Sequence, residues 1–163
     1  MESDDVVHQA EIAGFLNAHQ GEQHLIVLQD YPDPDAISSA LAHQLISAAF
    51  DIKCDIVYSG KISHQQNIAL VRLVGVELVR FEPSLDVKKY AGAIFVDNQG
   101  TTAEETIRRL EEAGVPALVV VDHHELQHRL KPVFTDIRKG VGATATIYAD
   151  YLEQGLIPMD KSR

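Results

Sequence analysis

Hydrophobic residues along the chain fall into short apolar or alternating segments and into longer segments with helical spacing. The short segments predict buried strands over residues 25–28, 54–58, 77–81, 92–96 and 116–121, with an edge strand over residues 132–137. Helical spacing predicts helices over residues 5–18, 36–50, 63–73, 102–113 and 143–151. Because strands alternate with helices, the pattern predicts a doubly wound α/β fold, in which a mostly parallel sheet is flanked by helices.

The length and composition of the chain fit one globular domain. With 163 residues, 45% of them hydrophobic, the chain can bury a core of ordinary size. We therefore expect a single α/β domain over residues 1–163 that opens with an N-terminal helix within residues 1–21. No apolar stretch approaches the roughly 20 residues that cross a bilayer as a helix, which argues against a membrane partner.

Charge and cysteine content narrow the range of functions. The formal net charge of -10 argues against a broad basic surface and against long duplex nucleic acid as a partner, although a local groove could hold a phosphate. The single Cys54 excludes an internal disulfide framework and a cysteine-rich zinc site. The acidic amino-terminal residues lack the basic and apolar regions of a signal peptide, so we expect a cytoplasmic protein.

An acidic turn follows the first predicted strand. Asp33 and Asp35 alternate there with Pro32 and Pro34, which favour extended and turn conformations and should keep the next helix from starting early. The two carboxylates are then expected to project together at the end of the strand. The alternative is that Asp33, Asp35 and Ser38 only cap the helix.

Two later strands also end on polar residues. Asp97 follows the strand over residues 92–96, where its carboxylate would face the same crevice; the alternative is a turn made with Asn98 and Gly100. The strand over residues 116–121 is followed by the three residues Asp122, His123 and His124.

Asp122, His123 and His124 offer a carboxylate and two imidazoles, which are side chains that bind manganese, iron or zinc. Neighbouring side chains on a strand point to opposite faces, so both histidines reach one ion only if the chain turns. We expect one histidine to bind a metal and the other to contact the substrate. The alternative is an uncoordinated histidine pair in a surface loop.

The order and spacing of these motifs resemble the DHH phosphoesterases. That family includes single-strand exonucleases, oligoribonucleases, cyclic dinucleotide phosphodiesterases, exopolyphosphatases and manganese pyrophosphatases. The resemblance covers about residues 24–155, and it is greatest to the oligoribonuclease and phosphoadenosine-phosphate phosphatase branch. It rests on Pro32-Asp33-Pro34-Asp35-Ala36 with Ser39, on Asp97, and on Val121-Asp122-His123-His124.

The resemblance implies a site for two divalent cations. Asp33 would belong to one metal site and Asp35 to the other, while Asp97 would bridge them and His123 would complete the second. Oxygen and imidazole ligands favour Mn²⁺, with Mg²⁺, Co²⁺ or iron as alternatives. A pair of such ions about 3.5 to 4 Å apart activates a water molecule for attack on a phosphate ester. By the same resemblance His124 would hold the phosphate under attack, and Asp122 would orient the motif.

The chain departs from the family pattern in two ways. Gln29 stands where the family usually has a metal-binding histidine; an amide oxygen is a poorer ligand, so the first metal should bind weakly unless Asp30 contributes. The family's fourth metal-binding aspartate and its carboxy-terminal substrate domain have no counterpart, because Asp136, Asp150 and Asp160 lie in a different context. We therefore expect the chain to correspond to the amino-terminal catalytic half, as a fragment or a naturally short relative, with reduced activity in isolation.

Two further segments are candidates for binding the substrate. His64 and Asn67 share a face near the start of the helix predicted over residues 63–73, where free backbone amides could receive a phosphate or a base. Gly142 and Thr144 lie in a glycine-containing segment before the last helix that does not match a Walker loop. The alternative for the first segment is ordinary helix capping by Ser63.

These observations predict a metal-dependent enzyme that hydrolyses phosphodiester or phosphomonoester bonds. Its partners would be short oligonucleotides or small nucleotides, and a homodimer stays open. The alternative is a non-catalytic nucleotide-binding or protein-interaction module that retains the fold.

Overall fold

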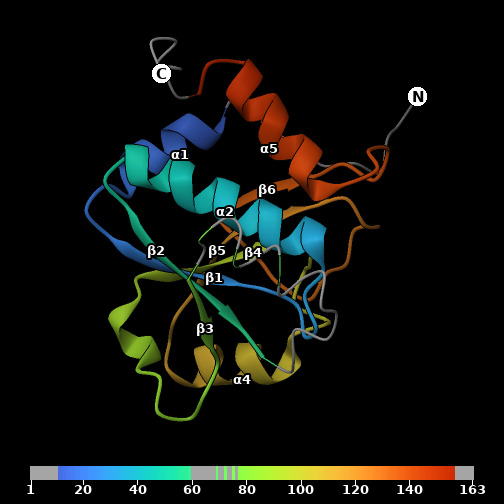
Figure 1. Cartoon of the computed structure of the whole chain (residues 1–163). Coiled ribbons are helices and arrows are strands. Elements are labelled where there is room, and N and C mark those ends of the chain that lie inside the picture. Colours follow the sequence, from blue (N-terminus) through green and yellow to red (C-terminus); the bar gives the residue numbers. More distant parts are fainter. Residues whose placement is uncertain (1–10, 60–68, 70–71, 73–74, 76, 157–163) are drawn as a thin grey trace.

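The computed structural model of the protein describes residues 11–59, 69, 72, 75 and 77–156. The described residues form a six-stranded sheet in the order β3-β2-β1-β4-β5-β6 (Figure 1), and all neighbouring strands run parallel. The strands are β1 Gln23–Val27, β2 Lys53–Tyr58, β3 Leu78–Arg80, β4 Gly92–Val96, β5 Ala117–Asp122 and β6 Phe134–Ile137. The helices are α1 Ile12–Ala18, α2 Pro34–Ala49, α4 Glu104–Glu112 and α5 Thr144–Glu153, with a short 3₁₀ turn, η2, at Val87–Lys89.

The strand order reverses between β1 and β4, as it does in a doubly wound sheet. From β1 the chain proceeds outward through β2 to β3, and from β4 it proceeds in the opposite direction through β5 to β6. Helices α1, α2 and α5 cover one face of the sheet and α4 covers the other (Figure 1). The predicted α/β fold with a parallel sheet flanked by helices is confirmed.

Side chains of β1 and of the residue that follows it alternate between the two faces of the sheet, and both faces are packed against helices. Ile26 and Leu28 pack into the core beneath α1, α2 and α5, whereas Leu25 and Val27 pack into the core beside α4. All four side chains are buried. A strand that is buried on both faces is apolar at every position rather than at alternate positions, which explains the continuous run from which it was predicted.

The start of α2 corrects the prediction from the sequence. The helix begins at Pro34 rather than at residue 36, and the Asp33 carboxylate caps it by accepting a hydrogen bond from the Ala36 N–H at 2.9 Å. A proline at the first helical position costs little, because its missing N–H would have no partner within the helix. The prolines therefore did not delay the helix, and capping describes Asp33 correctly.

Other predicted elements agree with the structure to within a few residues. The turn η2 was not predicted, since its three residues carry no clear hydrophobic period. The helix predicted over residues 63–73 and the first part of the predicted N-terminal helix lie outside the described residues. In the part of the chain that the structure describes, no helix combines the length and hydropathy that spanning a bilayer requires.

Gly100 and Gly114 form a matched pair for testing the turn that follows β4. Both have positive φ, +98° and +75°, so alanine is strained at either position. A Cβ at Gly100 would also lie 2.3 Å from Ile107 Cδ1, whereas one at Gly114 would meet nothing within 4 Å. We expect Gly114→Ala to cost about 1 kcal/mol and Gly100→Ala about 3 kcal/mol in urea unfolding, because only Gly100→Ala adds overpacking to strain. Equal losses would show that the packing at Gly100 is not tight.

Candidate metal centre

The carboxyl ends of β1, β4 and β5 lie side by side at one edge of the sheet. Strand β4 is paired with both β1 and β5, and the reversal of strand order falls between β1 and β4. In open α/β sheets ligands bind in the crevice beyond such a reversal. The residues that directly follow these three strands therefore meet at the place where a ligand is expected.

Asp35 is held by the first turn of α5. One of its carboxylate oxygens accepts the Thr144 N–H at 3.0 Å and the other accepts the Ala145 N–H at 2.9 Å. Helix α5 has no capping side chain at its own N-cap residue, Ala143, so Asp35 supplies the cap from the start of α2. Free backbone N–H groups and the positive end of the helix dipole both favour a carboxylate there. This contact fixes the direction in which the Asp35 carboxylate points.

Asp97 lies directly after β4 with its side chain only 2% exposed. Its backbone has φ +59°, a left-handed conformation that aspartate tolerates better than most residues. The Thr144 hydroxyl donates a hydrogen bond of 3.1 Å to Asp97 Oδ1. Burial, followed by the negative charge of Asp35, raises the pKa of Asp97 to about 8. The structure therefore gathers acidic groups that repel each other unless a proton or a cation lies among them.

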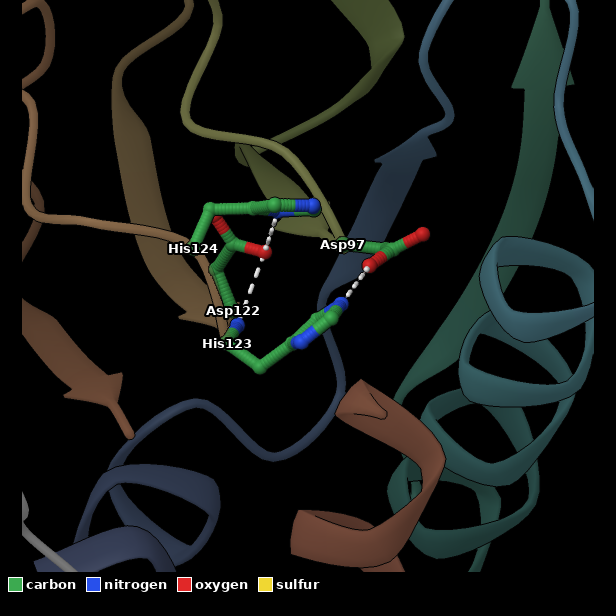
Figure 2. Close-up of side chains that lie close together, drawn as sticks. All are labelled: Asp97, Asp122, His123 and His124. Atoms are coloured by element: carbon green, nitrogen blue, oxygen red, sulfur yellow. Dashed lines mark hydrogen bonds and ion pairs between the residues drawn. The ribbon is translucent and has the colours of Figure 1, made fainter. Parts of the chain in front are cut away.

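His123 joins the two carboxylates. Its Nε2 atom lies 3.3 Å from Asp97 Oδ1 and 3.5 Å from Asp35 Oδ2. Figure 2 shows the His123 ring directed at Asp97 from the end of β5. Three side chains from separate segments thus converge within a few ångströms.

His124 lies beside His123, with ring centroids 4.3 Å apart, but the buried Asp122 holds it in place. Asp122 Oδ1 lies 2.7 Å from His124 Nδ1 and also accepts the His123 N–H at 2.8 Å (Figure 2). The side chain of His124 is 51% exposed. A carboxylate at Nδ1 favours a proton on that nitrogen, which leaves Nε2 for other contacts.

Gln99 is a structural residue of the site that was not predicted from the sequence. Its side chain is 3% exposed, and its Nε2 donates to Asp122 Oδ2 and to the Glu125 carbonyl, both at 2.9 Å. Its Oε1 accepts the Gln127 N–H at 2.7 Å. An amide after a strand suggests an exposed turn, and nothing in the sequence signals that this one is buried. Gln99 thereby ties the turn after β4 to Asp122.

The remaining predicted site residues occupy different surroundings. Thr144 is fully buried behind the carboxylates of Asp35 and Asp97, and Gly142 is exposed. Thr144 bonds to both carboxylates and therefore positions them. The sequence had instead suggested that Thr144 contacts the substrate. His64 and Asn67 lie outside the described residues.

Gln29 borders a pocket of about 160 Å³ next to the centre. Asp30, which follows it, accepts a hydrogen bond from the Ser59 hydroxyl. The other residues that line the pocket are Asp97, Asn98, Gln99, Thr101, Thr102, Asp122, His124 and Gln127.

The donor groups fit a divalent cation. One ligand atom from each of Asp97, Asp122, His123 and His124 lies within 4.8 Å of the others. Asp35 adds a further carboxylate, through its contact of 3.5 Å with His123 Nε2. Carboxylate oxygens with imidazole nitrogens are the ligand set of manganese, iron and zinc sites, and a cation among them would offset the repulsion at Asp97.

Comparison of the amino-acid sequence with protein families agrees with this arrangement. Residues 24–162 match the family model described as "DHH family, N-terminal domain". The chain therefore belongs to the DHH family, and the resemblance seen in its motifs is confirmed. An uncharacterized protein of Methanocaldococcus jannaschii, MJ1633, is 32% identical to it over 128 residues, which make up 78% of this chain and 25% of that protein.

Two solved structures share the fold. A crystal structure of an exopolyphosphatase-related protein from Bacteroides fragilis superposes with a TM-score of 0.61 at 13% identity, covering 91% of this chain and 44% of that one. A crystal structure of exonuclease RecJ bound to manganese gives 0.57 at 16% identity, covering 97% of this chain and 41% of that one. The chain thus spans a quarter of the M. jannaschii protein and less than half of either crystallised chain.

Replacing Asp97 with asparagine should stabilise the cation-free protein at pH 8 and not near pH 4. With the pKa raised from 3.8 to about 8, the native state holds a proton that the unfolded chain releases in this window, so stability falls as the pH rises through it. An asparagine side chain at this position would not repel Asp35, and asparagine also tolerates positive φ. Urea unfolding should show a gain on the order of a few kcal/mol at pH 8, since one pKa unit corresponds to about 1.4 kcal/mol.

Asp51→Asn is the matched control for Asp97→Asn. Asp51 also has positive φ, +60°, but it is exposed. The substitution Asp51→Asn should leave the pH dependence of the free energy of unfolding unchanged. The same pH dependence in Asp97→Asn and in the wild type would show that the Asp97 carboxyl does not carry the buried charge inferred here.

Gln99→Met should destabilise the protein by about 2 to 4 kcal/mol in urea unfolding. Methionine fills a similar volume but leaves the Asp122 carboxylate and the Gln127 N–H with fewer partners in a buried setting. Thr101→Val is the control, because it removes an exposed hydrogen bond to Gln127 Oε1 and should cost less than about 1 kcal/mol. Similar losses in both variants would exclude a special role for the buried amide.

Proposed function

We propose that the chain carries the catalytic centre of a metal-dependent phosphoesterase that acts on short oligonucleotides or small nucleotides. The observation that carries the proposal is the convergence of Asp35, Asp97 and His123 at the reversal of strand order, beside an open pocket. The manganese bound to RecJ and the exopolyphosphatase-related neighbour support it, because both have the same fold.

Asp35, Asp97 and His123 are the residues that would hold a divalent cation, for which Mn²⁺ is the first choice. Asp33 is exposed and caps α2 through Oδ1, so its other oxygen is left for a second cation. Gln29 lies at the same pocket and offers an amide oxygen. When bound, such cations lower the pKa of water and neutralise charge on a phosphate. Thr144 bonds to both central carboxylates, through its backbone N–H to Asp35 and through its hydroxyl to Asp97, and so orients them.

His124 is suited to hold the phosphate of the substrate. Its Nδ1 contacts Asp122, so the Nε2 atom on the other side of the ring is left to contact a phosphate oxygen. Asp122 is bonded in turn by Gln99, so the orientation of the ring depends on a buried chain of contacts. The exposure of His124 lets a ligand reach it from solvent.

The pocket beside the centre favours a small substrate. Its volume of about 160 Å³ is lined by amide and hydroxyl side chains together with Asp97, Asp122 and His124. Neutral amides and hydroxyls can bond to a sugar or a base but provide little attraction for a long polyanion. The net charge of -10 disfavours long duplexes for the same reason.

A non-catalytic nucleotide-binding or protein-interaction module is the second candidate. The observation that favours it is Gln29, an amide that borders the pocket where the family usually has a metal-binding histidine. On either account the carboxylate and imidazole cluster binds a cation.

His123→Ala should lower Mn²⁺-dependent hydrolysis at least ~100-fold, because it removes a ligand that links both central carboxylates. The measurement is product release from a short RNA, phosphoadenosine phosphate, a cyclic dinucleotide and pyrophosphate, with and without Mn²⁺. His128→Ala is the control, since His128 is exposed and lies five residues further along the chain.

The outcomes separate the two candidates. Turnover that is lost in His123→Ala and kept in His128→Ala supports the enzyme. Equal turnover in the wild type and His123→Ala would overturn the assignment of the site. If the protein binds nucleotides but hydrolyses none of these substrates, the result favours the binding module.

A further inference from the structure

A second group of metal-ligating side chains lies at the opposite end of β1 from the candidate metal centre. His19 follows α1, Glu22 lies in the turn before β1, and His24 is the second residue of that strand. Asp33 and Asp35 come after the other end of β1. Five strand residues separate the two ends by about 16 Å. A ligand at this second cluster would therefore be independent of the first.

The three side chains meet at one oxygen atom. Glu22 Oε1 lies 2.8 Å from His19 Nδ1 and 2.9 Å from His24 Nε2. One ligand atom from each residue lies within 4.8 Å of the other two. An expansion of a few tenths of an ångström would admit a cation, because metal-to-ligand bonds of about 2.0 to 2.2 Å place neighbouring ligand atoms roughly 3.3 Å apart.

The backbone around the cluster is firmly anchored. The Gly21 N–H donates to the Asp51 carbonyl at 2.8 Å, and the Lys53 N–H donates to the Glu22 carbonyl at 3.1 Å. Gly21 has φ +85°, which lets the chain turn tightly between His19 and Glu22. The ring of His19 packs on Phe15, with centroids 4.3 Å apart. The ligand groups are thus placed by secondary structure rather than by a loose loop.

His24 is an unusual residue for its position. It is completely buried in β1, and its Nδ1 has no hydrogen-bond partner among the described residues. A buried polar atom without a partner costs about 1 to 3 kcal/mol, which an apolar residue in the strand would avoid. The Nε2 atom of the same ring is directed at Glu22, so this buried histidine contributes a nitrogen to the cluster.

We propose that His19, Glu22 and His24 form a second metal site, which binds one divalent transition-metal ion. Two imidazoles and one carboxylate suit Zn²⁺ best, with the fourth position taken by water. Water can reach it because the side chains of His19 and Glu22 are 22% and 33% exposed. The bound ion ties the end of α1 to the start of β1, so it stabilises the docking of that helix.

The test is calorimetric titration of Zn²⁺ into a variant that lacks the first site. In the background Asp97→Asn with His123→Ala, one equivalent of Zn²⁺ should still bind. Adding His19→Gln or Glu22→Gln should weaken that equivalent at least tenfold, whereas adding Gln20→Ala should not. Gln20 is exposed and lies between the two ligands in sequence. With Co²⁺ as the probe, the background and its Gln20→Ala derivative should show the visible absorption of a four-coordinate site. The His19→Gln and Glu22→Gln derivatives should lack it.

Each outcome decides between a metal site and a plain hydrogen-bonded cluster. Loss of the bound Zn²⁺ in His19→Gln and Glu22→Gln supports the site, provided that both variants fold. Thermal unfolding midpoints close to that of the background, measured in the presence of a chelator, would show that they do. Binding that is absent in the background, or that is the same in all of these variants, overturns it. Neither result depends on the proposed phosphoesterase activity, because that centre is disabled in every protein compared.

Discussion

The hydrogen bonds between the first turn of α5 and the carboxylates of Asp35 and Asp97 are the contacts on which the rest of the site depends. Two backbone N–H groups fix Asp35, and the Thr144 hydroxyl fixes Asp97. These bonds join three segments that are far apart in the sequence. They also favour negative charge, since a helix N-terminus carries a partial positive charge. The fold thus holds two acidic groups close enough to repel each other.

That repulsion would be relieved by a cation bound among the carboxylates. The buried Asp97 would be stable as a neutral acid or beside a positive charge, and its raised pKa expresses this preference. His123 lies within 3.5 Å of both carboxylates and supplies a nitrogen ligand. Asp122 has a different task, because its oxygens are used in orienting His124 and in bonding to Gln99. The neighbouring acids at the crevice are therefore not equivalent.

The sequence predicted the sheet and the convergence of three strand ends because both follow from the pattern of apolar residues. Strands β1, β4 and β5 are apolar throughout most of their length, and the first polar residue after each apolar run marks the carboxyl edge. Which groups each polar side chain contacts was harder to predict from the sequence. Thr144 was expected to meet the substrate, yet it bonds to Asp35 and Asp97 across 109 and 47 residues of sequence. Such contacts depend on the packing of α5 against α2, which no local pattern encodes.

The binding of a cation at Asp35, Asp97 and His123 can be tested with a crystal of the protein soaked in Mn²⁺ and measured near the manganese absorption edge. We expect an anomalous peak within about 2.3 Å of carboxylate oxygens of Asp35 and Asp97 and of the Nε2 atom of His123. A saturated crystal with no peak there, or with its peaks only at other places, would contradict it.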